Sequence, residues 1–307
     1  MRARDVGELL LLSVLWGAAY LFMRAAVPAF GPAPLIALRM AIAVAVLLPL
    51  LIWRGGLQQL RTQPMSLLVL ALPFTALPFL LLGFAAQHLT AGLLAVLNAT
   101  APLFAALIAH FFFHERLGRW RSAGLVVGFS GVALLTAGSA SLRSSLSLLA
   151  VASVLLTSML WAVGANYTRR RFGGMDTLAL TVGSLAVASL AVAPLAAATW
   201  PATPPPLRAW IETAFLGIGS SGLGFLLYYR LLRRIGAVRA MSVTFLNPVV
   251  ALVAGALYLG EAVDGQTLVS AAVVLAGTAL ALGLWPASDA AAAALERPAA
   301  VNRAGES

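Results

Sequence analysis

Residues 92–133 read GLLAVLNATAPLFAALIAHFFFHERLGRWRSAGLVVGFSGVA, and the chain repeats this pattern at residues 238–279, VRAMSVTFLNPVVALVAGALYLGEAVDGQTLVSAAVVLAGTA. At this offset of 146 residues, Pro102 falls on Pro248, Glu115 on Glu261 and Gly131 on Gly277. Between these positions apolar residues fall on apolar residues. Proline and glutamate are scarce inside apolar runs, so their coincidence indicates an internal duplication, which constrains the whole fold.

The duplication extends towards the amino terminus. Phe79 falls on Phe225 at the same offset, and Trp16 falls on Trp161 at an offset of 145 residues. We therefore predict a first five-helix repeat in residues 1–143 and a second in residues 144–285. Residues 286–307 are rich in Ala, Pro and charge, and are predicted to form a disordered cytoplasmic tail.

The composition indicates a membrane protein. Of 307 residues, 61% are hydrophobic and only 10% are charged, whereas soluble domains carry about 25% charged residues. The 20 basic residues are all arginine and lie in short clusters between apolar runs, which argues against nucleic acid as a partner. Absence of cysteine excludes thiolate metal sites, and no phosphate-binding Gly-rich Lys motif is present, so we expect no metal, cofactor or ATPase activity.

Ten apolar runs are long enough to cross the hydrocarbon of a bilayer. They cover about residues 9–29, 33–53, 66–87, 91–113, 121–139, 146–167, 176–199, 210–231, 240–259 and 267–285. The predicted fold class is therefore an all-α polytopic membrane protein. Because each repeat holds an odd number of spans, the ten transmembrane helices are expected to form two inverted five-helix repeats.

The arginines support this topology. With the amino terminus inside, 16 arginines fall in inner segments and only Arg143 and Arg208 in outer segments. Cytoplasmic loops hold the arginines of membrane proteins. The repeated loop also changes sign, from basic at 114–121 to acidic at 260–265. We therefore predict a multi-pass protein of the bacterial inner (plasma) membrane with both termini in the cytoplasm.

Inverted repeats are typical of secondary transporters, in which two halves alternately open a central site to each face. At this level the chain resembles the ten-span EamA-type permeases of the drug/metabolite transporter superfamily. The resemblance covers residues 9–285 and rests on Trp16-Gly17, Arg24, Arg39-Met40, Pro102, Glu115, Gly131, Asn247-Pro248, Gly260-Glu261 and Gly277. It implies a central cavity lined by spans 1, 3, 4, 6, 8 and 9, and export of small metabolites or drugs. Trp161-Ala162 replaces Trp-Gly in the second half, and no arginine there matches Arg39, so an asymmetric cavity is expected.

Polar and aromatic residues inside the spans are candidates for substrate binding, since polar groups in lipid need partners. The candidates are Trp16, Tyr20, Arg39, Asn98, Trp161, Tyr228, Thr244 and Asn247. Pro102 and Pro248 each deprive a carbonyl four residues earlier of its hydrogen bond, near Asn98 and near Thr244. We predict that these prolines interrupt their helices for gating; kinks that serve only packing are the alternative.

Arg24 and Arg39 are the two charges predicted to lie within the hydrocarbon, where a charge costs at least roughly 2.5–3.5 kcal/mol. No carboxylate is expected inside the spans, because Glu8, Glu115 and Glu261 lie at span ends. One reading is that Arg39 receives a substrate carboxylate through its planar fork. The other is that both arginines bind backbone carbonyls or extend towards the interface.

The favoured function is alternating-access export of a small metabolite, such as an amino acid or a related amphipathic compound. Hydrophobic or cationic drugs are the alternative substrates, since these would not need an arginine. Two rival classes are a channel-like protein and an intramembrane serine hydrolase built on the segment Gly219–Gly222. Spans 9 and 10 hold no histidine base, so we expect no enzyme. Proton or ion coupling, and a monomer or a homodimer, are left open.

Overall fold

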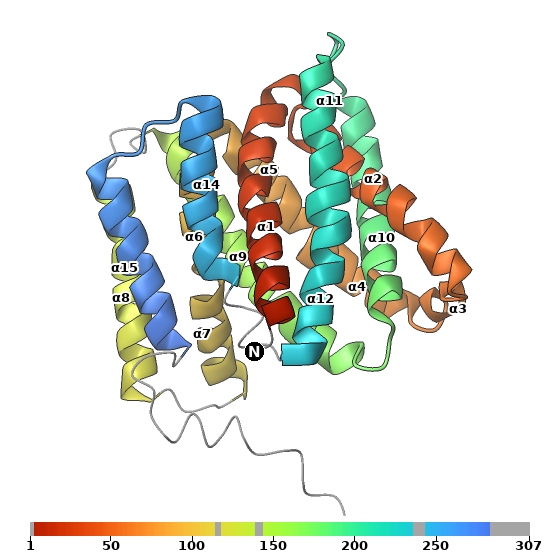
Figure 1. Cartoon of the computed structure of the whole chain (residues 1–307), viewed down its shortest axis with the longest axis horizontal. Coiled ribbons are helices and arrows are strands. Elements are labelled where there is room, and N and C mark those ends of the chain that lie inside the picture. Colours follow the sequence, from red (N-terminus) through yellow and green to blue (C-terminus); the bar gives the residue numbers. More distant parts are fainter. Residues whose placement is uncertain (1–2, 114–117, 139–143, 236–242, 283–307) are drawn as a thin grey trace, which may run out of the picture.

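The computed structural model describes residues 3–113, 118–138, 144–235 and 243–282, and within these ranges the chain is helical with no strand (Figure 1). Eight of the described helical runs are long and apolar enough to cross a bilayer, and two shorter apolar helices follow them. The prediction of an all-α polytopic membrane protein is confirmed. Glu115 and the predicted tail 286–307 lie outside the described residues.

The first five predicted spans agree with the observed helices to within a few residues. The helices are α1 (Ala3–Phe30), α2 (Pro32–Trp53), a short α3 (Leu57–Leu60), α4 (Pro64–Ala71), the π-helix η1 (Leu72–Ala76), α5 (Leu77–His88), α6 (Ala91–Asn98), α7 (Ala101–Phe113) and α8 (Arg119–Gly138). Gly31, at a φ of 77°, makes the tight turn after α1, and Pro32 begins α2. The Thr90 hydroxyl caps α6 by accepting from the Leu93 N–H.

The second five spans follow the same order. They comprise α9 (Ser145–Arg171), α10 (Thr177–Ala198), α11 (Leu207–Ala214), the π-helix η3 (Phe215–Leu223), α12 (Gly224–Ile235), α14 (Val243–Leu259) and α15 (Gly265–Ala281). Asp176 and Asp264 cap α10 and α15 with their carboxylates.

The helices pack in pairs that join the two halves of the chain. In Figure 1, α8 lies against α15 at the left edge and α2 lies against α10 at the right. Between them α1 packs on α14, and α5 packs on α9. Every one of these pairs combines a span from the first half with one from the second. The division into units 1–143 and 144–285 itself stays a prediction.

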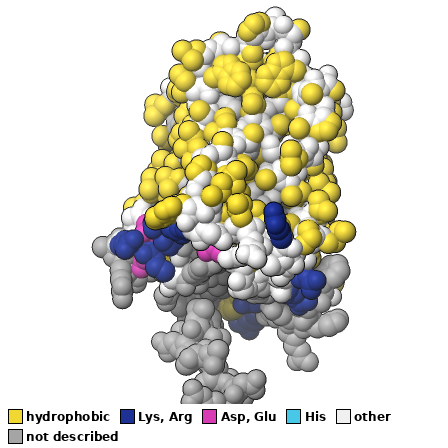
Figure 2. Space-filling view, turned by 90° about the vertical axis from the view of Figure 1, so that its right-hand side faces the viewer, with side chains coloured by type: hydrophobic (Ala, Val, Ile, Leu, Met, Phe, Trp, Pro, Cys, Tyr) yellow, Lys and Arg dark blue, Asp and Glu magenta, His cyan; other side chains and the backbone are white. Residues whose placement is uncertain are grey.

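The surface matches a bilayer. Hydrophobic side chains cover most of the height in Figure 2, and arginines with a few acidic residues gather near the lower end. Large apolar side chains point outward from several spans, among them Val126, Leu190 and Leu257, which are 71–84% exposed. Such a band would be unstable in water, and in a membrane it contacts the lipid tails.

Both helical runs that form spans 3 and 8 contain a π-helical segment. At the repeat offset, residues 72–76 (η1) fall on 218–222, which lie inside η3. The two segments differ in sequence: η1 contains Pro73, and η3 is rich in Gly and Ser. A π-segment inserts extra residues into a helix and is frequent at functional sites. The irregularity therefore recurs although the residues that produce it do not.

The two repeated prolines behave differently, which corrects the prediction that both interrupt helices. The run is broken at Ala99 and Thr100, just before Pro102, whereas Pro248 lies inside the continuous helix α14. Thr100 explains the break, because its hydroxyl donates to the Leu97 carbonyl at 2.6 Å and stabilises a tighter turn. Leu246 occupies the corresponding position before Pro248 and cannot form this bond.

Glycines hold α8 against α15. A Cβ atom on Gly277 would overlap the backbone nitrogen of Gly128, and one on Gly131 would lie 2.8 Å from the backbone nitrogen of Val274. Gly124 and Gly128, four residues apart on α8, belong to the same contact: a Cβ on Gly124 would lie 2.7 Å from the Gly277 carbonyl. The pair therefore packs α8 on α15 within one chain.

We predict that Gly277→Ala destabilises the protein by about 1–3 kcal/mol, because the added methyl group forces two backbones apart. The thermal unfolding temperature of the purified protein in detergent measures this. Gly7→Ala is the control, since nothing lies within 4 Å of a Cβ there and alanine favours the helix. Equal unfolding temperatures for the two variants would show that the α8–α15 contact is loose.

Candidate functional site

Arg39 on α2 lies in the interior of the helical bundle, with 3% of its surface exposed. Its Nε donates to the Ser221 hydroxyl at 2.7 Å, and one Nη donates to the Ser220 hydroxyl at 3.0 Å. The guanidinium carbon lies 4.4 Å from the ring centroid of Phe79 on α5. A single charged group thus connects spans 2, 3 and 8.

The sequence of η3 allows this contact. A Cβ on Gly217 would lie 2.6 Å from Cβ of Ile42 and 3.0 Å from the Arg39 carbonyl, so only glycine permits η3 to approach α2 this closely. Ser220 and Ser221 follow within the same π-segment and are both almost fully buried. The close approach therefore brings two adjacent hydroxyls to one guanidinium.

Within the described part of the chain, Arg39 forms no ion pair with a carboxylate. Two neutral hydroxyls and a cation–π contact compensate for the burial of its charge. A desolvated cation–π contact contributes about 2 kcal/mol. A buried charge is usually paired with an opposite charge, since desolvation is costly. The arrangement leaves a cation in a low-dielectric environment with a net positive charge, which favours an incoming anion.

Two aromatic pairs flank Arg39 and connect the halves of the chain crosswise. Trp16 on α1 packs on Phe225 of α12, with ring centroids 5.8 Å apart. Trp161 on α9 packs on Phe79 of α5, at 5.6 Å. Trp16 falls on Trp161, and Phe79 on Phe225, in the repeat. The same pair thus forms twice, each time between a residue of one half and a residue of the other.

Trp16 also reaches the serine segment. Its indole N–H donates to the Ser220 carbonyl at 3.2 Å, and its ring lies 5.1 Å from Tyr228. A Cβ on Gly224 would lie 2.5 Å from the indole nitrogen, so a glycine makes room for the ring. The structure thereby brings the predicted Trp16, Tyr228 and Arg39 around η3.

A second polar chain runs beside the first. The Asn98 amide donates to the Tyr20 hydroxyl at 2.6 Å, and the Ser158 hydroxyl donates to the Asn98 side-chain oxygen at 3.2 Å. Tyr20 and Asn98 are both buried. Ser158 precedes Trp161 by three residues on α9, so the two lie on the same face of that helix. The predicted Tyr20 and Asn98 are therefore in direct contact.

Asn247 on α14 carries a buried side-chain oxygen that has no hydrogen-bond partner among the described residues. The backbone of α14 is close to α1 here, since a Cβ on Gly17 would lie 3.0 Å from the Asn247 carbonyl. This places Asn247 beside the turn of α1 that carries Trp16 and Tyr20. Thr244 lies one turn earlier on α14 and is partly buried.

Two segments of the chain, residues 7–137 and 148–283, match the sequence profile described as the EamA-like transporter family. The chain belongs to the EamA-like transporter family. The expected resemblance to EamA-type permeases is thereby confirmed.

Two relatives and one solved structure illustrate how this EamA-like chain compares with known proteins. It is 26% identical over 280 residues to a protein of Streptantibioticus cattleyicolor named "Probable terminal-alkyne amino-acid exporter", covering 91% of this chain and 93% of that one. It is 26% identical over 265 residues to the "Uncharacterized inner membrane transporter YedA" of Escherichia coli, covering 85% and 83%. A crystal structure matches with a TM-score of 0.69 at 21% identity, covering 97% of this chain and all of the other, which shows the shared fold.

Arg24, the other predicted intramembrane charge of this EamA-like protein, has a different environment from Arg39. One Nη donates to the Ala86 and Gln87 carbonyls at the end of α5, at 2.8 and 2.9 Å. Its Nε lies 3.7 Å from a carboxylate oxygen of Glu261. Contacts with backbone carbonyls were one of the two predicted readings. Glu261 follows the end of α14, as expected for a residue at a span end, and it reaches Arg24 because the loop after α14 folds back over α6.

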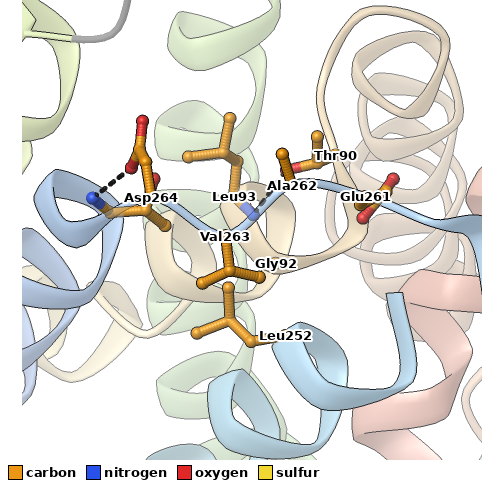
Figure 3. A pocket seen from close by; sticks show the side chains of 9 residues that line it. Thr90, Gly92, Leu93, Leu252, Glu261, Ala262, Val263 and Asp264 are labelled. Atoms are coloured by element: carbon orange, nitrogen blue, oxygen red, sulfur yellow. Dashed lines mark hydrogen bonds between the residues drawn. The ribbon is translucent and has the colours of Figure 1, made fainter. Parts of the chain in front are cut away.

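Glu261 holds this end of the molecule together. Its carboxylate accepts from the Ala91 N–H at the start of α6, at 2.9 Å. A Cβ on Gly255 would lie 2.5 Å from the carboxylate, and Gly260 turns the chain at a φ of 66°, so both glycines are needed. The loop residues 261–264 and the start of α6 line a cavity of about 60 Å³. Figure 3 labels the residues that line it.

A buried carboxylate was also missed. Glu212 on α11 is 2% exposed, pairs with Arg208 at 3.0 Å and accepts from the Tyr258 hydroxyl at 3.3 Å. Among the residues around Arg39, sequence reasoning missed Ser220, Ser221, Phe79 and Ser158 as partners. The repeat already placed Phe79 on Phe225, but Ser220 and Ser221 could not be recognised as partners of Arg39 because the π-segment that directs them is not visible in the sequence.

We predict a pH-dependent contribution of Glu261 to stability. Burial raises the pKa of this carboxyl, outweighing the opposing effects of the Ala91 N–H and Arg24. A raised pKa means that the folded state binds the proton more tightly, so the contribution is fully present below pH 4.5, the ordinary value, and is lost as pH rises through the folded pKa. The unfolding temperature of the wild type, measured relative to that of Glu261→Gln, should therefore fall as the pH rises above 4.5. A difference between the two proteins that is constant with pH would contradict this.

Proposed function

We propose that this protein is a secondary transporter that exports a small amphipathic metabolite, an amino acid or a close relative, by alternating access. Membership of the EamA-like transporter family supports the transport activity. The amino-acid exporter named among its relatives supports the substrate class. The proposal includes no catalysed chemical step, and the Ser220 and Ser221 hydroxyls serve to hold Arg39 rather than to act as nucleophiles.

The observation that carries the substrate class is the buried guanidinium of Arg39, held by two hydroxyls and a ring instead of a carboxylate. A substrate carboxylate would supply the missing negative charge and can bind the planar guanidinium through two parallel hydrogen bonds. Neutral hydroxyls are displaced more easily than a carboxylate partner would be. A hydrophobic or cationic drug would gain nothing from this group.

Other predicted site residues fit the rest of an amino acid. The orphan oxygen of Asn247 can accept a hydrogen bond from an ammonium group, which would remove the cost of its own burial. Trp16 and Trp161 would form aromatic walls for the side chain. Tyr20 and Asn98 already bond to each other, and we assign them to the same site through their neighbours on α1 and α9.

Ion pairs at both ends of α1 support alternating access. At one end Arg24 contacts Glu261, and at the other Arg230 and Arg234 of α12 contact Glu8 at 3.1 and 2.6 Å. Opening either end requires breaking one of these sets. We assign the arginine-rich end to the cytoplasm because positively charged segments stay inside. In this proposal a single chain in the inner membrane forms the whole pathway, with both termini in the cytoplasm.

The test is counterflow into liposomes that contain the purified protein and a preloaded amino acid. Unlabelled amino acids and their methyl esters compete with the labelled substrate. Because a hydrogen bond between charged groups contributes about 1.5–3 kcal/mol, the free acid should compete roughly 10- to 100-fold better than the ester. Arg39→Gln should abolish this discrimination.

Arg24→Gln is the matched control, since it removes an arginine of the same kind from α1 and should keep the discrimination even if the rate falls. Equal competition by acid and ester in the wild type would refute a carboxylate contact at Arg39. If only cationic or hydrophobic drugs showed counterflow, the proposed amino-acid substrates would be wrong and drugs would be the substrate class. Flux without saturation would indicate a channel, and ester hydrolysis lost in Ser221→Ala would indicate an enzyme.

A further inference from the structure

A groove of about 410 Å³ opens at the arginine-rich end between α2, α10 and α12, away from the Arg39 site. Its deeper wall is formed by leucines, Leu50 on α2 and Leu223 and Leu226 on η3 and α12. Its rim carries Arg54 and Arg230. Leu223 is 44% exposed and belongs to a membrane span, so in a bilayer this groove opens towards lipid tails.

The charged and apolar residues are arranged by depth. Leu50 lies four residues before Arg54 on α2, and Leu226 lies four residues before Arg230 on α12, so each helix presents a leucine directly below an arginine. Leu223 lies almost one further turn below. Both segments thus place a leucine one turn before an arginine, and all four residues line the groove.

The charges at the rim leave one cation without a counterion. Arg230 and Arg234 contact Glu8, and Arg234 also contacts Asp5. Asp176 is the acidic residue that lines the groove, and its carboxylate caps α10 by accepting from two backbone N–H groups. Arg54 is exposed and forms no ion pair within the described residues.

We propose that this groove binds an anionic phospholipid of the surrounding leaflet, with its phosphate between Arg54 and Arg230 and an acyl chain along the leucines. Two features carry the assignment. A groove open to the hydrocarbon is filled by lipid, and arginine-lined pockets between transmembrane helices at the cytoplasmic side suit acidic headgroups. The proposal is independent of the transported substrate, because none of these residues contacts Arg39.

Native mass spectrometry of the delipidated full-length protein tests the proposal. The protein is mixed with equal amounts of phosphatidylglycerol and phosphatidylcholine that have identical acyl chains, and the retained lipid is measured. We expect phosphatidylglycerol to be retained preferentially. Arg54→Gln should lower that preference by roughly fivefold, the effect of about one basic residue near a membrane surface. Arg61→Gln, an exposed arginine outside the groove, should leave it unchanged.

A second pair of variants tests the position of the acyl chain. Leu223→Trp fills the groove without changing charge and should lower retention of phosphatidylglycerol. Leu257→Trp, at a lipid-facing position on α14 that is 84% exposed, should not. Unfolding temperatures confirm that each variant is folded.

Three results would overturn the proposal. These are equal retention of the two lipids by the wild type, equal retention by both variants of either pair, and displacement of phosphatidylglycerol by inorganic phosphate at the same concentration. The last would show a simple phosphate site. Transport by the wild type does not enter the measurement, so the proposal can fail while the transport function stands, and the reverse.

Discussion

A charged guanidinium in the interior of a membrane protein must be solvated by the protein itself, and Arg39 shows how much of the fold this requires. Ser220 and Ser221 supply the acceptors, which requires the π-segment η3 and its close approach to α2 at Gly217. Phe79 supplies the ring, which couples Arg39 to Trp161 on α9. Four spans thus contribute to the surroundings of one charged side chain. An aliphatic residue at position 39 would not have needed these partners. Such a cost is retained where it serves function.

The repeat explains the frame of this site but not its charge. The π-segments recur at matching positions, and the Trp–Phe pair forms twice across the halves. Arg39 and its serines occur once: Leu185 stands at the position that corresponds to Arg39, and Thr75 at the position of Ser221. A symmetric frame can exchange its two halves, and in the proposed function the single charge of Arg39 would give an anionic substrate one orientation within that frame.

The helices could be predicted from the sequence because lipid imposes a length and a composition on every span. The repeat pointed to Trp16 and Trp161, and scarcity of charge pointed to Arg24 and Arg39. Side-chain partners could not be predicted, because they depend on local deviations from the regular helix. Ser220 and Ser221 reach Arg39 only through η3, and Glu261 reaches Arg24 only because Gly260 and Gly255 fold the loop back. Pro102 and Pro248 show the same limit: equal prolines gave a break in one run and a continuous helix in the other, and Thr100 made the difference.

Arg24 and Arg39 together show why an intramembrane charge has to be judged by its partners rather than by its position. Both lie about six residues from the same turn, and their cost by residue type is the same. Arg24 contacts two backbone carbonyls and a carboxylate, so its charge is balanced by its partners. These contacts also connect α1 with the end of α5 and, through Glu261, with the start of α6. Arg39 contacts only neutral groups among its described partners, so its charge remains available to an anion. The first arrangement is complete without a ligand, whereas the second gains most when an anion arrives.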